Sequence, residues 1–229
     1  VAVRNGEKNI SRLLNSLKMQ TYHGQMEFII VDDQSTDTTI NIIQNFNKMD
    51  SRFKYFSSED GDTKLAHKKR ALDFGIKNAQ FEHLIFTDID CILQNSWIEN
   101  MILSFTDETH YLIGYAEAVD DTTSASKFQK TDFFMLLSAA RGMVNNKSAW
   151  ACTGQNQGYR KSLYNAVGGF SKIEKQVQGD DSLFLLLCRK AKNINVNFAN
   201  NPESFVISRP ELTWHSLIKQ RIRWAGDSK

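Results

Sequence analysis

The segment EFIIVDD, residues 27–33, is an uninterrupted apolar run that closes on two carboxylates. The segment HLIF, residues 83–86, ends in the same way, with Asp88 and Asp90 close behind it. Runs of this length and composition are typical of parallel strands that are covered on both faces. We therefore predict two strands of one sheet, each with carboxylates at its C-terminal end.

Helical periodicity fills the sequence around these strands. The apolar residues at 10, 13, 14 and 17 follow the i, i+3, i+4, i+7 rule, and those at 42, 43 and 46 follow it roughly. Strand and helix thus alternate, which predicts a βαβ sheet. In such a sheet the ligand crevice lies outside the carboxyl ends of the strands, so both acidic clusters should face one crevice.

The second half of the chain is less regular. We predict a helix over residues 124–140, a glycine turn at 168–169 and an apolar helix over 182–188. Proline is scarce and no low-complexity run marks a linker, so we expect a single domain over residues 1–229. The sequence opens with Val-Ala-Val, and we expect a fragment of a longer chain that is clipped in its first strand, with possible further segments after its C-terminus.

Charge excludes one class of partner. Lys plus Arg number 28 against 26 for Asp plus Glu, and the resulting net charge of +2 provides no field suited to wrapping a polyanion. We therefore expect no nucleic acid partner.

Cysteine usage and hydropathy bear on the cellular setting. Cys91, Cys152 and Cys188 are far apart and form no CxxC pair, which is typical of reduced thiols in the cytosol. The longest apolar run, residues 183–188, is far below the roughly 20 residues that span a bilayer, and the N-terminus shows no signal peptide. We expect a cytoplasmic location, or one on the cytoplasmic face of a membrane that missing C-terminal segments would reach.

The motif Asp88-Ile89-Asp90 is a candidate metal site. Two carboxylates two residues apart, on a backbone that turns after a strand, can face one hard cation such as Mg²⁺ or Mn²⁺. Acidic pairs also solvate loop ends or cap helices, so the motif alone is weak. Its position after an apolar strand favours the functional interpretation.

Three further polar segments allow two interpretations each. The side chains of residues 31–37 can bind a base or ribose, or cap the helix that follows. The basic run at residues 68–70 lies near the start of a helical stretch that ends about Asn78, where it either binds a diphosphate or forms a solvated face. Asp180 and Asp181 open the apolar helix, where Asp180 is either an N-cap or part of a site whose carboxylates the helix dipole keeps ionised.

The C-terminal segment combines guanidinium groups with indole rings. The motif QRIRW at residues 220–224 follows Trp214 and His215, and together these residues can grip phosphate or stack on a sugar. The alternative is an amphipathic surface helix that rests on a membrane or on a missing segment. His215 is either an extra metal ligand or a structural residue.

Seven short motifs follow one another along nearly the entire chain. They are VRNGE at 3–7, VDDQSTD at 31–37, DID at 88–90, TGQN at 153–156, GGF at 168–170, GDD at 179–181 and QRIRW at 220–224. Their order and spacing resemble the family 2 glycosyltransferases, with QxxRW the most distinctive piece. The resemblance implies a GT-A fold, a Rossmann-like, mostly parallel central sheet flanked by helices, and an inverting mechanism.

The resemblance also implies roles on the donor side of the site. Asp33 would contact uracil, and Arg4, Glu7 and Lys68 would line the nucleotide pocket, with Arg70 as the alternative to Lys68. The register of these basic residues is open by one or two positions.

For the metal and the proton, the resemblance assigns three aspartates. Asp90 would ligate the divalent metal, and Asp88 would sit by the ribose or join the metal shell. Asp181 matches the catalytic base. The usual Glu-Asp pair of the family reads Asp180-Asp181 here, and we expect Asp180 to help bind the acceptor.

The remaining matched residues are expected around the sugar and the acceptor. Residues of the TGQN motif would shape that pocket, and residues of QxxRW would close over the diphosphate and the acceptor. These predicted contacts are Gly154, Gln155, Asn156, Gln220, Arg223 and Trp224.

The function predicted is metal-dependent transfer of a sugar from a nucleotide-sugar donor, a UDP-sugar, to a hydroxyl of a glycan or lipid-linked acceptor in cell-surface glycan or polysaccharide synthesis. Two alternatives are weighed against it. A nucleotidyltransferase needs a Gly-rich basic loop after its first strand, and Arg4 to Glu7 form a poor one. An inactive binding module would not need Asp33, Asp88, Asp90 and Asp181 together.

Overall fold

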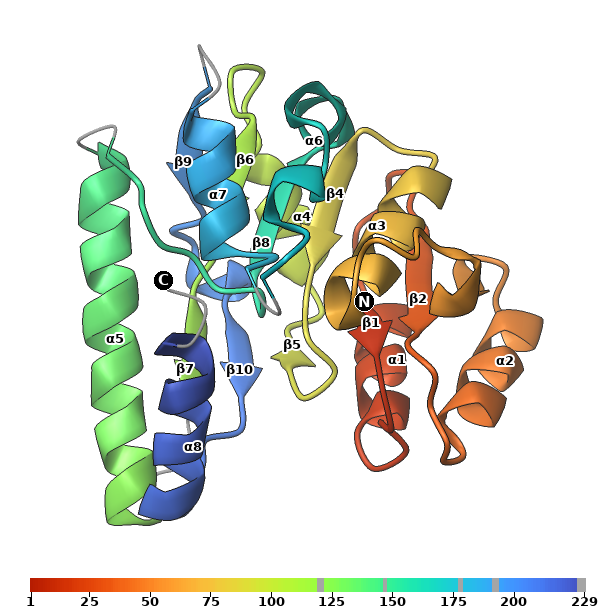
Figure 1. Cartoon of the computed structure of the whole chain (residues 1–229), viewed down its shortest axis with the longest axis horizontal. Coiled ribbons are helices and arrows are strands. Elements are labelled where there is room, and N and C mark those ends of the chain that lie inside the picture. Colours follow the sequence, from red (N-terminus) through yellow and green to blue (C-terminus); the bar gives the residue numbers. More distant parts are fainter. Residues whose placement is uncertain (119–121, 146–147, 177–178, 191–193, 226–229) are drawn as a thin grey trace.

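The computed structural model describes residues 1–118, 122–145, 148–176, 179–190 and 194–225. Its helices alternate with short strands along the first half and are less evenly spaced in the second (Figure 1). The α-helices are α1 (Ile10–Lys18), α2 (Thr39–Met49), α3 (His67–Asn78), α4 (Trp97–Leu103), α5 (Ser124–Asn145), α6 (Lys161–Val167), α7 (Ser182–Arg189) and α8 (Trp214–Ala225). The strands are β1 (Ala2–Val3), β2 (Phe28–Asp32), β3 (Phe53–Ser57), β4 (His83–Phe86), β5 (Ile92–Leu93), β6 (Tyr111–Ile113), β7 (Ala116–Ala118), β8 (Gln157–Arg160), β9 (Val196–Phe198) and β10 (Val206–Ser208).

The strands form three sheets with different pairing rules. The first, ordered β1-β2-β3, is parallel throughout. In the second, ordered β4-β8-β6-β9, strand β8 runs antiparallel to both β4 and β6, and β6 and β9 are parallel. In the third, β10 pairs antiparallel with β5 and parallel with β7. The expected α/β architecture with a parallel sheet and flanking helices is confirmed. The prediction that β2 and β4 share one sheet is wrong, because β4 pairs with β8, far along the chain, and not with the first sheet.

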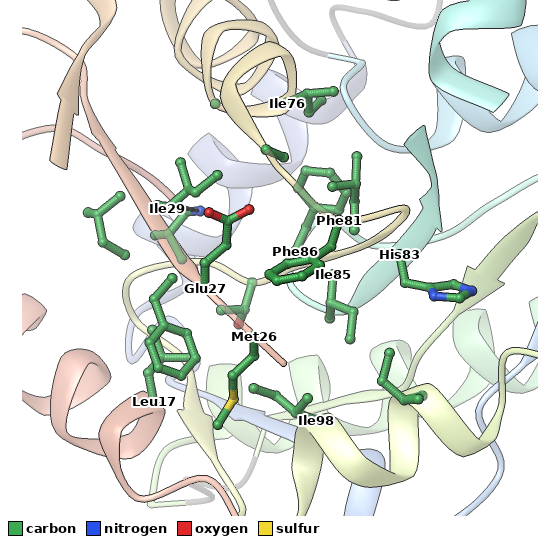
Figure 2. Close-up of a pocket in the computed structure, with 18 of the residues that line it drawn as sticks. Leu17, Met26, Glu27, Ile29, Ile76, Phe81, His83, Ile85, Phe86 and Ile98 are labelled. Atoms are coloured by element: carbon green, nitrogen blue, oxygen red, sulfur yellow. Dashed lines mark hydrogen bonds between the residues drawn. The ribbon is translucent and has the colours of Figure 1, made fainter. Parts of the chain in front are cut away.

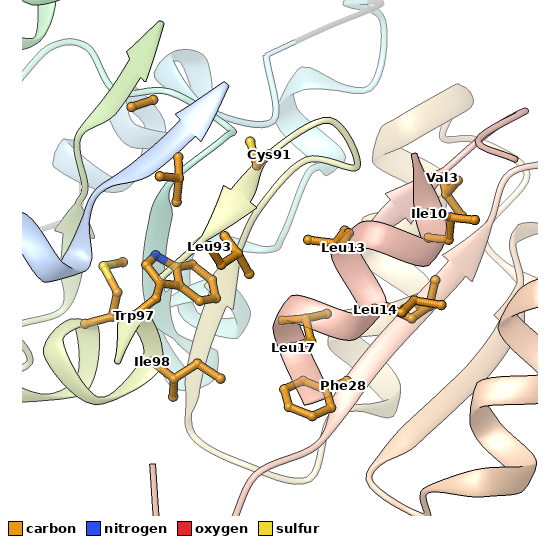
Figure 3. Packing of buried hydrophobic residues seen from close by; sticks show 14 of the residues in the cluster. Val3, Ile10, Leu13, Leu14, Leu17, Phe28, Cys91, Leu93, Trp97 and Ile98 are labelled. Atoms are coloured by element: carbon orange, nitrogen blue, oxygen red, sulfur yellow. The ribbon is translucent and has the colours of Figure 1, made fainter. Parts of the chain in front are cut away.

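The helix α1 forms where the apolar spacing predicted it. Its four apolar positions at 10, 13, 14 and 17 are all buried, because the 3.6-residue period places them on one face. Figure 3 shows this face packing towards Leu93, Trp97 and Ile98, which follow β4 in the chain. One core cluster therefore joins the N-terminal helix to the segment after the second predicted strand.

A second core cluster, rich in aromatic rings, lies behind the β8 strand. The rings of Tyr159 and Phe86 stack at 4.5 Å, and Phe184 of α7 lies 4.9 Å from Tyr159. The ring of Tyr164 also stacks on Tyr159, with the ring centroids 6.1 Å apart. Since β8 lies between β4 and β6, this cluster fixes the start of α7 against the centre of the second sheet.

Three predicted elements of the second half can be compared with the structure, and the apolar helix predicted over residues 182–188 is confirmed as α7. The helix α5 extends to Asn145, five residues beyond its predicted end, because Val144 continues the buried spacing set by Leu137 and Ala140. Gly168 and Gly169 have φ values of 82° and 58°, which confirms the predicted turn and explains the glycines. Among the helices that the structure describes, none is long and apolar enough to cross a bilayer.

A cavity of about 500 Å³ lies between β2 and β4 (Figure 2). The strand β1 pairs with β2 only next to Val31 and Asp32, so the earlier part of β2 faces this space. Its walls are mostly apolar and include Ile29, Ile76 and Ile85. The cavity is thus a gap in the hydrophobic core, and its walls do not carry the acidic residues predicted for the site.

Candidate active site

The loops after β1 and β2 are interlocked by side-chain bonds. The backbone N–H of Asn5 donates to Ser35 Oγ at 2.8 Å, and Thr36 N–H donates to Asn5 Oδ1 at 2.8 Å. Thr38 Oγ1 donates to Glu7 Oε2 at 3.0 Å. Asn5 adopts a φ of 51°, a left-handed conformation that asparagine tolerates better than most residues. Glu7 and the 31–37 loop therefore form one rigid rim. One carboxylate oxygen of Glu7 is used in the hydrogen bond to Thr38.

The cap of α2 lies within that rim. Asp37 accepts the backbone N–H of Thr39 at 3.0 Å, so its side chain caps the helix although Thr38 occupies the N-cap position. Gly6 N–H donates to Thr39 Oγ1 at 2.7 Å. The exposed side chain of Arg4 lies beside this rim in sequence.

Asp33 is held at the carboxyl end of β2. Its backbone N–H donates to Val3 O at 2.7 Å, which continues the β1-β2 ladder. Its side chain is only 8% exposed and accepts a hydrogen bond from Ser58 Oγ at 2.9 Å. Ser58 follows β3 and was missed by the sequence reasoning, because nothing in the spacing links it to Asp33. The carboxylate is thereby oriented from both neighbouring strands.

Lys68 joins the two acidic motifs. Its Nζ lies 2.8 Å from Asp88 Oδ1 and 3.1 Å from Asp180 Oδ2. Burial alone would lower the pKa of Lys68, but the charges of Asp180 and Asp88 outweigh it and hold the pKa well above its ordinary value. The residues after β4 and before α7 thus meet at one ammonium group, although 92 positions separate Asp88 from Asp180 along the chain, by subtraction of their numbers.

The three basic residues at 68–70 have three different environments. Arg70 donates to the backbone carbonyls of Glu59 and, at 3.3 Å, of Gly61. Lys69 is fully buried and donates to the carbonyls of Ile173 and Gln176. The interpretation of the run as a solvated basic face is therefore wrong, and Lys68 is the member placed in the acidic cluster.

Asp181 is the N-cap of α7. Its carboxylate accepts the backbone N–H of Ser182 and, at 3.3 Å, that of Gly154. Burial, and after it the charge of Asp180, raises the pKa of Asp181 to about 6, while Lys68 acts in the opposite direction. The N-cap interpretation of Asp180 is wrong by one residue, because Asp180 instead forms the ion pair with Lys68. A carboxylate with a pKa near 6 is suited to accept a proton at neutral pH.

Gly154 lies directly beside this cluster. A β-carbon at this position would come within 3.2 Å of Lys68 Nζ and 3.4 Å of Asp180 Oδ2. The carboxamide oxygen of Gln155, next in the chain, is buried and has no hydrogen-bond partner among the described residues. The structure thus brings Gly154 to the acidic cluster, and the sugar or acceptor pocket expected at Gly154 and Gln155 stays a prediction.

Asn156 requires a correction. Its side chain is 0% exposed, and its amide donates to the carbonyls of Tyr115 and Ser204 at 2.9 and 2.8 Å. Its Oδ1 accepts the indole N–H of Trp97 at 3.1 Å. A saturated and buried amide does not reach a sugar, so Asn156 is a structural residue that joins three segments of the second half.

The QxxRW motif lies on α8, which packs against α5. Gln220 accepts from Gln129 of α5 at 3.3 Å, and the ring of Trp224 lies 5.8 Å from that of Phe133. Arg223 is exposed, and so is His215. The described contacts of Gln220 and Trp224 anchor the helix, and their predicted closure over the diphosphate and acceptor stays a prediction.

The chemistry of Asp88 and Asp90 fits a divalent cation. Both carboxylates lie on one turn after β4, and oxygen donors are what Mg²⁺ and Mn²⁺ prefer. Burial raises the pKa of Asp90 and the charge of Asp88 raises it further, so the two groups repel each other where a cation would relieve them. Arg12, another residue that the sequence reasoning missed, donates to Asp90 O at 3.3 Å and supports the turn.

The protein alone would fill only part of a metal's coordination shell. Across the described ranges, no group of three or more His, Cys, Asp or Glu side chains could hold a metal ion, which gives no support to His215 as a ligand. Binding through one or two carboxylates, with substrate phosphates and water in the other positions, is usual for Mg²⁺. The donor set therefore fits a cation that is bound together with a diphosphate.

This fold, with acidic residues at the ends of β2 and β4, defines a class of protein, the GT-A glycosyltransferases, and solved structures of that class superpose on most of the chain. The mannosyltransferase PcManGT from Pyrobaculum calidifontis, solved with GDP-Man and Mn²⁺, has a TM-score of 0.71 at 17% identity, covering 99% of this chain and 59% of its own. Residues 1–349 of S. aureus TarS, solved with UDP, have a TM-score of 0.62 at 16% identity, covering 91% of this chain and 58% of that one.

Within that class the chain belongs to glycosyl transferase family 2, whose family model matches residues 1–168. A putative glycosyltransferase of Bacillus subtilis (strain 168), EpsH, is 36% identical over 123 residues, which are 53% of this chain and 34% of that protein. The poly(ribitol-phosphate) beta-N-acetylglucosaminyltransferase TarS of Staphylococcus aureus is 30% identical over 112 residues, 48% of this chain and 18% of that protein. The chain thus spans about a third or less of the length of these curated relatives.

Proposed function

We propose that this chain catalyses metal-dependent, inverting transfer of a sugar from a UDP-sugar to a hydroxyl acceptor. The observation that carries the proposal is the double ion pair of Lys68 with Asp88 and Asp180, since it brings the strand-end carboxylates and the N-terminus of α7 into one cluster. Solved structures of similar fold hold UDP or GDP-Man. The family shown by residues 1–168 supports the same reaction class.

The donor would lie along the carboxyl ends of β1, β2 and β4. Asp33, which Ser58 orients, would accept a hydrogen bond from the N–H of a uracil ring, and Arg4 and Glu7 would border the nucleotide pocket. Asp88 and Asp90 would hold Mn²⁺ or Mg²⁺, which when bound supplies charge neutralisation for the diphosphate leaving group. Lys68 would add a second positive charge beside that group.

Asp181 would act as the general base. Its carboxylate takes the proton of the acceptor hydroxyl while that oxygen forms a bond to the anomeric carbon and the bond to the diphosphate oxygen breaks. The single displacement inverts the anomeric centre. The backbone N–H groups of Gly154 and Ser182 fix the orientation of the carboxylate, and its raised pKa suits proton transfer near neutral pH.

The acceptor side is proposed on fewer contacts. Gly154 and Gln155 would shape the sugar and acceptor pocket, with Asp180 as a hydrogen-bond acceptor and the α8 residues Gln220, Arg223 and Trp224 closing over it. We propose a glycan or lipid-linked acceptor in cell-surface glycan or polysaccharide synthesis. The corresponding site of action would be the cytoplasm or the cytoplasmic face of a membrane.

A panel of nucleotide sugars tests the proposal. UDP-glucose, UDP-N-acetylglucosamine and GDP-mannose are each incubated with the protein and Mn²⁺, and released nucleoside diphosphate is measured with and without a chelator. We expect chelator-sensitive release of UDP from a UDP-sugar, and its loss in Asp181→Asn. Donor binding without metal-dependent release from any donor would instead identify a binding module and overturn the proposed reaction.

A further inference from the structure

Large apolar side chains are exposed together on α8. Trp214, Ile218 and Ile222 are 47%, 54% and 66% exposed, and their spacing of four residues places them in one stripe along the helix. Another side of α8 is anchored, since Leu217 is only 2% exposed and Trp224 packs on the core. The stripe therefore lies on a helix that is packed against the rest of the protein.

A basic stripe runs beside the apolar one. His215, Lys219 and Arg223 each follow an apolar residue of the first stripe by one position, and all three are exposed. Residues 214–225 contain no Asp or Glu. The outward half of α8 is thus divided lengthwise into an apolar and a cationic strip, the pattern of a helix that lies in a membrane interface.

The neighbouring helix α5 continues the same surface. Phe128 and Met135 are 50% and 64% exposed, and the ring of Phe128 lies 5.3 Å from that of Trp214. The indole N–H of Trp214 donates to Ser124 Oγ at 3.1 Å. The exposed apolar residues of α5 therefore adjoin the apolar stripe of α8 at Trp214. Figure 1 shows α5 and α8 side by side at one edge of the molecule.

The charges of α5 complete the pattern. Lys127, Lys130 and Arg141 are exposed on this helix, and Lys130 lies 3.9 Å from the carboxylate of Glu117 on β7. Asp132, the acidic residue of α5, forms an ion pair with Arg221 of α8. By the helical spacing, Lys127, Lys130 and Arg141 lie with the exposed Phe134 on the side of α5 away from α8, while Phe128 and Met135 lie towards α8. An apolar band over the seam of the two helices is thus bordered by cations on both sides.

We infer that the surface formed by Phe128, Met135, Trp214, Ile218 and Ile222, with its basic borders, docks on an anionic lipid bilayer. We name this surface the α5–α8 face. Apolar side chains would enter the acyl boundary, and the long cationic side chains would reach the headgroups beside them. The inference does not depend on the proposed sugar transfer.

Charge favours a bilayer over a second copy of this chain. In a symmetric dimer through the α5–α8 face, each basic border would meet the partner's borders or its apolar band. Like charges brought together in this way oppose association, whereas anionic headgroups are complementary to both borders.

Vesicle co-sedimentation tests the inference directly. The probes are phosphatidylcholine vesicles with and without about 30% phosphatidylserine, a fraction that gives a surface potential attractive to basic segments. We expect the protein to sediment with the anionic vesicles, less with the neutral ones, and less again as salt is raised. Failure to sediment with anionic vesicles at low salt would overturn the inference.

Two variants and one matched control locate the contact. Ile218→Ser combined with Ile222→Ser should weaken partition into anionic vesicles by about tenfold or more, and Lys219→Glu by several-fold. Lys48→Glu, an equally exposed charge change on α2, should change partition little. Circular dichroism and thermal melting establish that each variant is folded, and light scattering establishes its mass. Equal partition of all variants, or a dimer that the Ile218→Ser and Ile222→Ser changes dissociate, would contradict the inference.

Discussion

The two halves of this molecule are built on different principles. In the first, β1, β2 and β3 pair in parallel with strands that are close in sequence, and single helices connect them. In the second, β4 pairs with β8, which begins 71 residues after β4 ends by subtraction of 86 from 157, and strand directions are mixed. The first half carries the proposed nucleotide loops, and the second carries the proposed metal ligands and the proposed base. The difference shows that the site is assembled at the junction of a locally ordered half and one ordered by long-range contacts.

Lys68 is the residue through which the halves meet chemically. It belongs to α3 of the first half, and its ammonium group binds one carboxylate after β4 and one before α7. Substitutions on either side of this junction should therefore have separable effects: on donor and metal binding, on proton transfer, on the pH profile, and on stability alone.

The largest effect is expected from Asp181→Asn. Removing the base should lower kcat by on the order of 10³-fold, within the range typical of general-base catalysis. Binding of UDP with Mn²⁺, measured by calorimetry, should persist because Asp33, Asp88 and Asp90, the proposed donor and metal contacts, are unchanged. Asp107→Asn, on an exposed loop, serves as the control for loss of a carboxylate. Near-normal turnover in purified Asp181→Asn would remove the base assignment.

A second effect is expected from Asp90→Ala. Loss of one of two carboxylates should weaken Mn²⁺-dependent UDP binding on the order of a hundredfold, because charge on the diphosphate is no longer balanced. The measurement is calorimetry with UDP in the presence and absence of Mn²⁺. Without metal, the variant and the parent protein should bind UDP alike, and an equal loss in both conditions would refute metal ligation by Asp90.

A smaller effect, on the pH profile, is expected from Lys68→Met. Because Asp181 must be ionised to accept a proton, kcat/KM should rise with pH through about 6 in the parent protein. Lys68 lowers the pKa of Asp181, so its removal should move the rising limb to higher pH. On the acidic side of the limb, activity should fall about tenfold for every pH unit by which the limb moves. The exposed Lys64→Met is the matched control. A limb that stays in place would show that Lys68 does not influence the base.

The smallest effect on chemistry, and a large one on stability, is expected from Asn156→Ala. Three groups, the carbonyls of Tyr115 and Ser204 and the indole N–H of Trp97, would lose their buried partner. The free energy of unfolding should fall by about 3 kcal/mol, measured by urea denaturation. The folded fraction should keep its KM for donor and acceptor. A raised acceptor KM with unchanged stability would restore Asn156 to the pocket.

The same contrast between the halves explains what the sequence could predict. The helix α1, the ends of β2 and β4 and the turn at Gly168 follow from local periodicity and glycine chemistry, and the structure has them where they were expected. The contact of Lys68 with Asp180 and the burial of Asn156 depend on segments far apart in the chain, so no spacing rule reveals them. The N-cap was predicted at Asp180 and lies at Asp181. Which of two adjacent carboxylates caps a helix depends on the backbone conformation, which the spacing of residues does not give.

The cavity between β2 and β4 has a mechanical consequence. The two strands belong to separate sheets, and along this gap apolar side chains face each other across open space. The halves are tied at the carboxyl ends of the strands by Lys68, and along the gap by the packing of α1 on Trp97 and by the hydrogen bond from Thr21 N–H to Asn95 O. Val31 and Thr87, the neighbours of Asp32 and Asp88, also line the gap, so a change in its width would be transmitted to the carboxylates at the ends of both strands.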